Sequence, residues 1–96
     1  MTPDAIWDYC RRKHYSAAFA AYWGDNTRCE ACEKRQSATP HHIRTRGSGG
    51  DDSDANLLAL CAEDHSMIGT MGRSAFCKRF PHLKKKVDAA MERSRA

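Results

Sequence analysis

The sequence of 96 residues lacks any apolar run near the roughly 20 residues that a membrane-spanning helix needs, so we expect no membrane segment. It also lacks a signal-peptide pattern, because the acidic residues Asp4 and Asp8 come early, and we expect a cytoplasmic protein. Internal repeats are missing as well. The chain is therefore predicted to form one small domain, 1–96, whose modest core would gain from an additional staple.

The five cysteines are odd in number, which does not suit a closed disulfide framework. In a reducing compartment, the pair Cys29-x-x-Cys32 followed by Cys61 is more typical of metal binding. Redox proteins use the same spacing for a cysteine pair, but the flanking sequence lacks their βαβ pattern. We therefore expect these three thiolates to bind a structural metal, with Cys10 and Cys77 outside the site.

The composition and net charge exclude no class of partner. The composition, 41% hydrophobic and 29% charged, is ordinary for a globular protein. A formal net charge of +4 suits a polyanionic partner, but solvated basic faces explain it equally well.

Helical spacing of apolar residues predicts one helix over 3–23, with Thr2 as its N-cap and Gly24 at its end. Its aromatic residues are expected in the core rather than in a ligand site. Three further helices are predicted downstream, over 62–71, 73–80 and 84–94.

An extended segment and a loop are predicted between the cysteine pair and Cys61. Pro40 disfavours helix just before it, so 39–46 should be extended. The adjacent His41 and His42 would then point to opposite faces and serve different purposes. The glycine- and serine-rich stretch 47–53 predicts a flexible loop. Taken alone, an adjacent histidine pair is usually a surface or core feature.

Several motifs follow one another in a fixed order: Cys29-x-x-Cys32, His41-His42-Ile43, Gly49-Gly50-Asp51, Asn56-Leu57, Cys61 and His65. This joint order resembles the HNH endonucleases over roughly 29–81, and the stretch 41–52 is similar to small HNH proteins of bacteria and their phages. The resemblance implies an α+β fold: a ββα-metal finger with a structural zinc over 29–72, an N-terminal helix over 1–24 and C-terminal helices over 73–96.

The resemblance implies a role for each matching position. His42 corresponds to the general base, and Asn56 to the residue that orients this base by pinning the loop whose carbonyl takes its proton. His41 and His65 correspond to ligands of a catalytic divalent ion such as Mg²⁺, Mn²⁺ or Ni²⁺. The three zinc ligands that match are Cys29, Cys32 and Cys61.

Two positions depart from the family pattern. Asp64 stands where the fourth zinc ligand is usually Cys or His; either its carboxylate completes the zinc site, or His65 does so at the cost of the catalytic site. Gly69 stands where many members carry a further metal-binding histidine. Members with two protein ligands at the catalytic ion do exist.

The implied function is metal-dependent hydrolysis of DNA phosphodiester bonds, by nicking or double-strand cleavage. An imidazole with a pKa of about 6.5 can accept the proton of an attacking water near pH 7. The implied partner is the DNA phosphate backbone, and the sequence does not indicate an oligomeric state. The alternative is a zinc-stapled DNA-binding module with a degenerate, inactive nuclease site.

Overall fold

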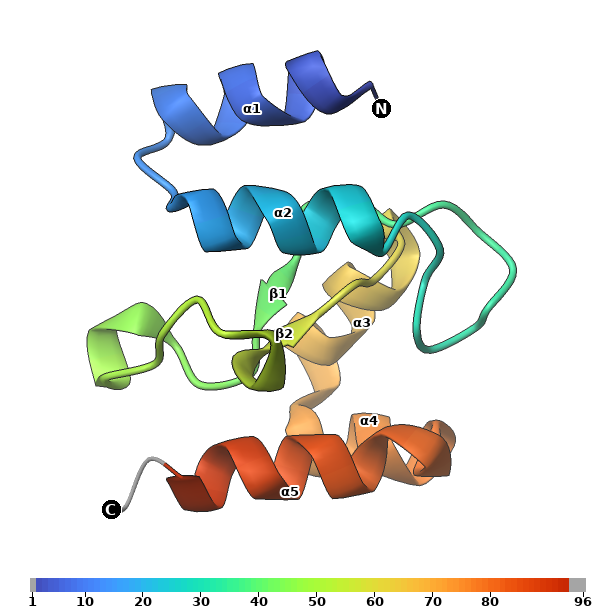
Figure 1. The fold of residues 1–96 in the computed structure, drawn as a ribbon. Helices are drawn as coiled ribbons and strands as arrows, with labels where there is room; N and C mark the ends of the chain where they lie inside the picture. Colours follow the sequence, from blue (N-terminus) through green and yellow to red (C-terminus); the bar gives the residue numbers. More distant parts are fainter. Residues whose placement is uncertain (1, 94–96) are drawn as a thin grey trace.

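The computed structural model describes residues 2–93, and within this range it contains five α-helices and one two-stranded sheet (Figure 1). This mixture confirms the predicted α+β class. None of the helices in the described range is long and apolar enough to cross a membrane. The elements are α1 Pro3–Arg12, α2 Ala17–Asp25, β1 His41–His42, β2 Leu57–Leu58, α3 Ala62–Met71, α4 Arg73–Arg79 and α5 Lys84–Arg93, with short 3₁₀ turns η1 Arg46–Ser48, η2 Asp54–Asn56 and η3 Pro81–Leu83.

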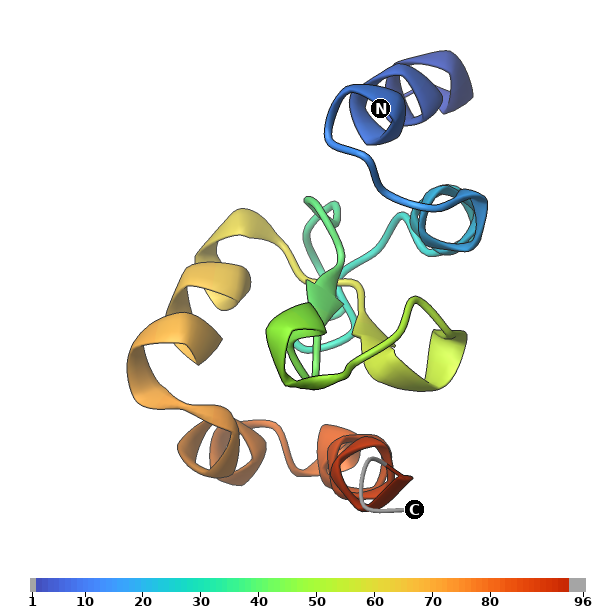
Figure 2. The same ribbon diagram turned by 90° about the vertical axis from the view of Figure 1, so that its left-hand side faces the viewer.

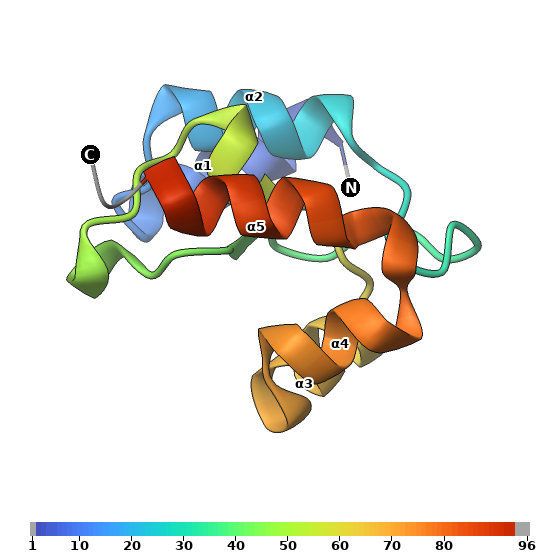
Figure 3. The same cartoon turned by 90° about the horizontal axis from the view of Figure 1, so that it is seen from below.

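The two strands form the centre of the molecule and are followed by α3. They pair antiparallel, with His41 opposite Leu58 and His42 opposite Leu57. The α1–α2 hairpin lies on one side of this pair and α5 on the other, with α3 at the flank (Figures 1 and 2). Seen from below, α5 runs across the molecule beneath α2, while α3 and α4 lie to one side (Figure 3).

Alternate residues around β2 face two separate hydrophobic clusters, as the two-residue period of a strand requires. Leu57 and Ala59 belong to the cluster with α1 and α2, whereas Leu58 and Leu60 belong to the cluster with α3, α4 and α5. All four side chains are fully buried. The N-terminal hairpin is therefore needed to cover one face of the sheet.

The prediction of one helix over 3–23 is wrong, because the chain turns back between α1 and α2. His14 adopts a positive φ of 61°, and the Ser16 hydroxyl caps α2 by accepting the Phe19 N–H at 3.1 Å. The physical reason is burial. A single rod could not bring Ile6 and Cys10 of α1 against Phe19 and the other buried side chains of α2, as the hairpin does.

The downstream helices follow the predictions more closely. Helix α3 begins at Ala62 and ends at Met71, before Gly72 with its φ of 85°. The end of the last predicted helix, residue 94, lies outside the described residues. The extended prediction for 39–46 holds for the strand His41–His42 but fails at Arg46, where η1 begins.

Candidate functional site

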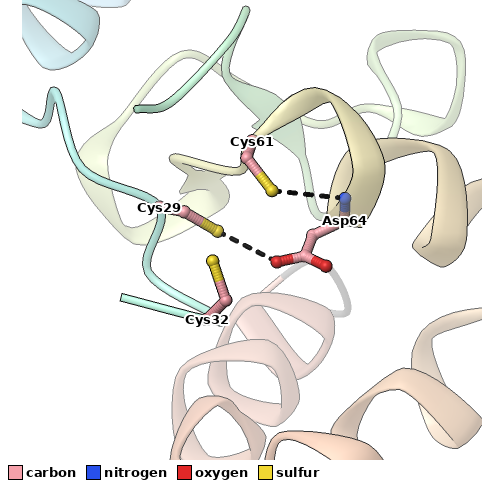
Figure 4. Close-up of side chains that lie close together, drawn as sticks. All are labelled: Cys29, Cys32, Cys61 and Asp64. Carbon is pink, nitrogen blue, oxygen red and sulfur yellow. Dashed lines mark hydrogen bonds between the residues drawn. The ribbon is translucent and has the colours of Figure 1, made fainter. Parts of the chain in front are cut away.

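Three cysteines and one aspartate meet beside the start of α3. The side chains of Cys29, Cys32, Cys61 and Asp64 point toward one another, and one ligand atom from each lies within 4.8 Å of the others (Figure 4). Tetrahedral sulfur ligands at about 2.3 Å from an ion are themselves about 3.8 Å apart, so the cluster has the size of such a site. These residues could hold a metal ion, and the thiolate-rich donor set is consistent with zinc.

Local backbone geometry positions these ligands. The Cys29 N–H donates to the Arg35 carbonyl at 2.9 Å, and the Glu33 N–H donates back to the Cys29 carbonyl at 3.0 Å, which folds the Cys-x-x-Cys segment into a tight turn. Cys61 is the N-cap of α3, and its sulfur accepts the Asp64 N–H at 3.5 Å. The first turn of α3 therefore brings Asp64 back over Cys61.

The electrostatics of the cluster centre on a buried carboxylate. Asp64 is only 1% exposed, and a buried charge is costly unless it is paired. Burial alone would raise the pKa of Asp64, but hydrogen bonds with the cysteines and the charge of Arg35 outweigh it and lower the pKa. Arg35 lies 3.7 Å from the Asp64 carboxylate and donates its Nε–H to the Cys61 sulfur at 3.3 Å. A divalent cation held by the four ligands would balance the charge of the carboxylate and the thiolates.

Three histidines line a separate groove of about 300 Å³, in which strand and helix residues converge. The rings of His41 on β1 and His65 on α3 meet edge to face, with centroids 5.1 Å apart. His65 thus lies beside His41 in the groove, whereas Asp64 lies with the three cysteines. The groove is lined by Tyr15, Thr39, Pro40, His41, His42, Thr45, Arg46 and His65.

The environment lowers the pKa of both imidazoles that meet in the groove. Burial is the main cause for His41, and His65, His42 and Arg73 add to it, so that its pKa falls to about 4. Burial also lowers the pKa of His65. Both rings are therefore neutral near pH 7, which is the form that binds a metal ion.

His42 has partners that differ from those of His41, as expected for neighbours on a strand. Its Nε2 lies 2.7 Å from Oδ1 of Asp52, and its ring stacks on Phe19 with centroids 5.3 Å apart. The other oxygen of Asp52 accepts the Ser16 hydroxyl at 2.6 Å. The expected acceptor was a loop carbonyl; the structure places a side-chain carboxylate there instead.

Asn56 holds the loop between the strands through hydrogen bonds of its side chain to the backbone. Its Oδ1 accepts the Arg44 N–H at 2.9 Å, and its Nδ2 donates to the carbonyls of Arg44 at 3.1 Å and Asp51 at 2.8 Å. Gly50 fits into this arrangement only because it has no side chain, since a Cβ would lie 1.8 Å from the Arg44 carbonyl oxygen. The stretch predicted to be flexible is thus held by hydrogen bonds next to Asp52.

A family model described as HNH endonuclease matches residues 29–70. This part of the chain is similar to the HNH endonuclease family. The match spans the thiol cluster and all three groove histidines, and this family comprises nucleases that act on DNA. Comparison with curated proteins and with solved structures finds no match.

Several residues around the groove escaped prediction from the sequence. Asp52 is the second of two adjacent acids at the end of the stretch 41–52, but no role is predicted for it from the sequence. Ser16, the N-cap of α2, and Phe19 within α2 lie outside the HNH match, and nothing in their spacing points to the histidines. Arg46, whose guanidinium lies 5.6 Å from the centre of the Tyr15 ring, lines the groove; it lies in the stretch 41–52, but no role is predicted for it from the sequence.

Proposed function

We propose that this protein is a metal-dependent endonuclease that hydrolyses DNA phosphodiester bonds. The observation that carries the proposal is the groove in which His41 and His65 meet edge to face while His42 is held by a carboxylate, all within the part of the chain that is similar to the HNH family. The zinc-type cluster next to it serves the fold, because it ties the Cys-x-x-Cys turn to the first turn of α3, which carries His65.

Each histidine has one task in this proposal. His42 accepts the proton of the attacking water. His41 and His65, both neutral near pH 7, bind a divalent ion such as Mg²⁺, Mn²⁺ or Ni²⁺. When bound, such an ion stabilises the negative charge that develops on the phosphate and on the leaving oxygen. Phe19 and Asp52 hold the ring of His42 through stacking and a hydrogen bond.

Positive charge beside the groove favours a nucleic acid as substrate. Arg46 lines the groove, and Arg73 is close enough to His41 to lower its pKa. Guanidinium groups pair well with phosphate oxygens, and the chain has a formal net charge of +4. In this proposal, Arg46 binds the DNA backbone next to the cleaved bond.

Plasmid relaxation tests the proposal. Zinc-loaded protein is incubated with supercoiled DNA in Mg²⁺, Mn²⁺ or Ni²⁺, and in parallel without an added divalent ion. We expect nicked or linear DNA only when the ion is present. His42→Ala, purified in the same way, controls for contaminating nuclease and should leave the plasmid supercoiled.

The second candidate function is a zinc-stapled DNA-binding module without catalysis. Gly69 favours it, because the position one helical turn beyond His65 offers no ligand atom. DNA that is bound and shifted on a gel, but not cut in any of the three metals, would support this alternative and contradict the nuclease proposal.

A further inference from the structure

A carboxylate bridges the general-base candidate and the N-terminal hairpin, which lies outside the HNH match. Asp52 uses Oδ1 for His42 and Oδ2 for Ser16, at 2.7 Å and 2.6 Å. The side chains of His42 and Asp52 are only 14% and 17% exposed, so little water competes for these hydrogen bonds. Segments distant in the sequence are thereby joined behind the groove.

We propose that Asp52 is the positioning residue of His42, and that helix α2 holds this pair in place through Ser16 and Phe19. The expected effect on catalysis rests on the proposed nuclease function, whereas the tautomer of His42 can be measured separately. Nothing in the HNH match assigns a role to α2, since the match begins at residue 29.

The chemistry follows from which ring nitrogen carries the proton. Because a carboxylate only accepts hydrogen bonds, Asp52 selects the His42 tautomer with hydrogen on Nε2. The lone pair is then on Nδ1, and this atom takes the proton from water. If the ring exchanged tautomers freely, Nδ1 would carry a hydrogen for part of the time and could not accept the proton of water.

Asp52 is better suited to orientation than to metal binding. Both of its oxygens already accept hydrogen bonds, from the imidazole and from the hydroxyl. These hydrogen bonds outweigh the effect of burial, which alone would raise the pKa of Asp52, and the pKa falls below its ordinary value. The group is therefore ionised, as an acceptor for the His42 N–H must be near neutral pH.

Helix α2 fixes the pair from two directions. The Ser16 oxygen accepts the Phe19 N–H at 3.1 Å while its hydrogen points to Asp52, so the cap of the helix and the anchor of the carboxylate are one group. Phe19, which is fully buried, stacks on the His42 ring at an interplanar angle of 19°. The first turn of α2 therefore limits both the position of Asp52 and the rotation of the imidazole.

The first experiment measures the tautomer and the rate with Asp52→Ala. Nitrogen NMR of the His42 ring in zinc-loaded wild type should show hydrogen on Nε2, and Asp52→Ala should show a mixture. Single-turnover cleavage at saturating protein should slow by roughly 10- to 100-fold, as for other residues that orient a working histidine, with unchanged DNA affinity. Hydrogen on Nδ1 in wild type, or an unchanged rate in Asp52→Ala, would overturn the inference.

The second experiment separates anchoring from helix capping. Ser16→Ala removes both hydrogen bonds and should slow cleavage by roughly tenfold, the value of a hydrogen bond to a charged group, whereas Ser16→Thr keeps both and should restore the rate. Thr2→Ala is the matched control, because Thr2 caps α1 in the same way, accepting the Ala5 N–H at 3.2 Å without contact to the groove. Equal losses of rate in Ser16→Ala and Thr2→Ala would show that only helix stability matters and would contradict the proposed anchor.

The two proposals fail in different ways. If zinc-loaded wild type does not cut DNA in any metal, the nuclease function fails, and the NMR result alone decides whether Asp52 orients His42. If wild type cuts and its tautomer is unchanged in Asp52→Ala, the nuclease function stands and the positioning role is wrong.

Discussion

Replacing Gly50 by alanine should destabilise the protein more than any other single methyl group added to its loops. A Cβ at this position would lie 1.8 Å from the Arg44 carbonyl oxygen and 2.9 Å from Nδ2 of Asn56, whereas ordinary contacts begin at 3.4 Å. The Arg44 and Gly50 backbones must therefore separate by about 1.6 Å. That movement breaks the two hydrogen bonds between Asn56 and the Arg44 backbone.

The cost can be estimated from those hydrogen bonds. Asn56 is 4% exposed, and each buried polar group left without a partner costs about 1–3 kcal/mol. Two lost hydrogen bonds give about 3 kcal/mol, which corresponds to a fall in Tm of roughly 12–24 °C for a domain of this size. Gly47→Ala is the matched control, because nothing lies within 4 Å of a Cβ there.

Thermal unfolding of the zinc-loaded proteins, followed by circular dichroism, measures the difference. We expect Gly47→Ala to unfold within about 4 °C of wild type, since a surface substitution away from special contacts changes stability by no more than about 0.5 kcal/mol. Equal Tm values for Gly50→Ala and Gly47→Ala would show that the loop is not held against Arg44 as described.

The remaining predictions concern the two sites. Cys29→Ser should lose zinc and unfold the domain, because structural zinc contributes on the order of 10 kcal/mol to such folds, while Cys77→Ala should keep its zinc; metal analysis and circular dichroism check both. NMR titration without a catalytic ion should give a His41 midpoint of about 4. Because this pKa lies below the unfolded value of about 6.5, the free energy of unfolding should fall as pH drops from about 6.5 to 4. The fall should be smaller in His41→Ala, in which only the lowered pKa of His65 still contributes. Gly69→His should raise Mn²⁺ affinity and cleavage rate together, since nothing within 4 Å obstructs a side chain there and residue 69 lies one turn beyond His65 on α3; unchanged affinity by calorimetry would exclude a ligand role for that position.

Short-range patterns in the sequence predict that the three cysteines come together, and the family resemblance adds Asp64 as one of two candidates for the fourth position. The Cys-x-x-Cys spacing and the start of a helix after Cys61 are local features, and together they bring Asp64 to the three sulfurs. The different partners of His41 and His42 follow from the alternation of a strand. In these cases the geometry depends on a few neighbouring residues.

The parts that could not be predicted depend on contacts between distant segments. The break between α1 and α2 follows from the need to cover Leu57 and Ala59, which no helical periodicity in 3–23 reveals. The link from Ser16 to Asp52 spans 36 positions and joins a helix cap to a loop. The requirement for glycine at position 50 depends instead on the three-dimensional path of the loop, which brings the Arg44 backbone against it.

The most direct test of the central claim is the single-turnover cleavage rate of His42→Ala beside that of wild type, both zinc-loaded and in the same divalent ion. His42 is assigned to proton transfer alone, so its removal should slow cleavage by roughly 10²- to 10⁴-fold. Zinc content, circular dichroism and DNA affinity should stay near those of wild type. Equal cleavage rates for the two proteins would contradict the claim that this groove hydrolyses DNA with His42 as its base.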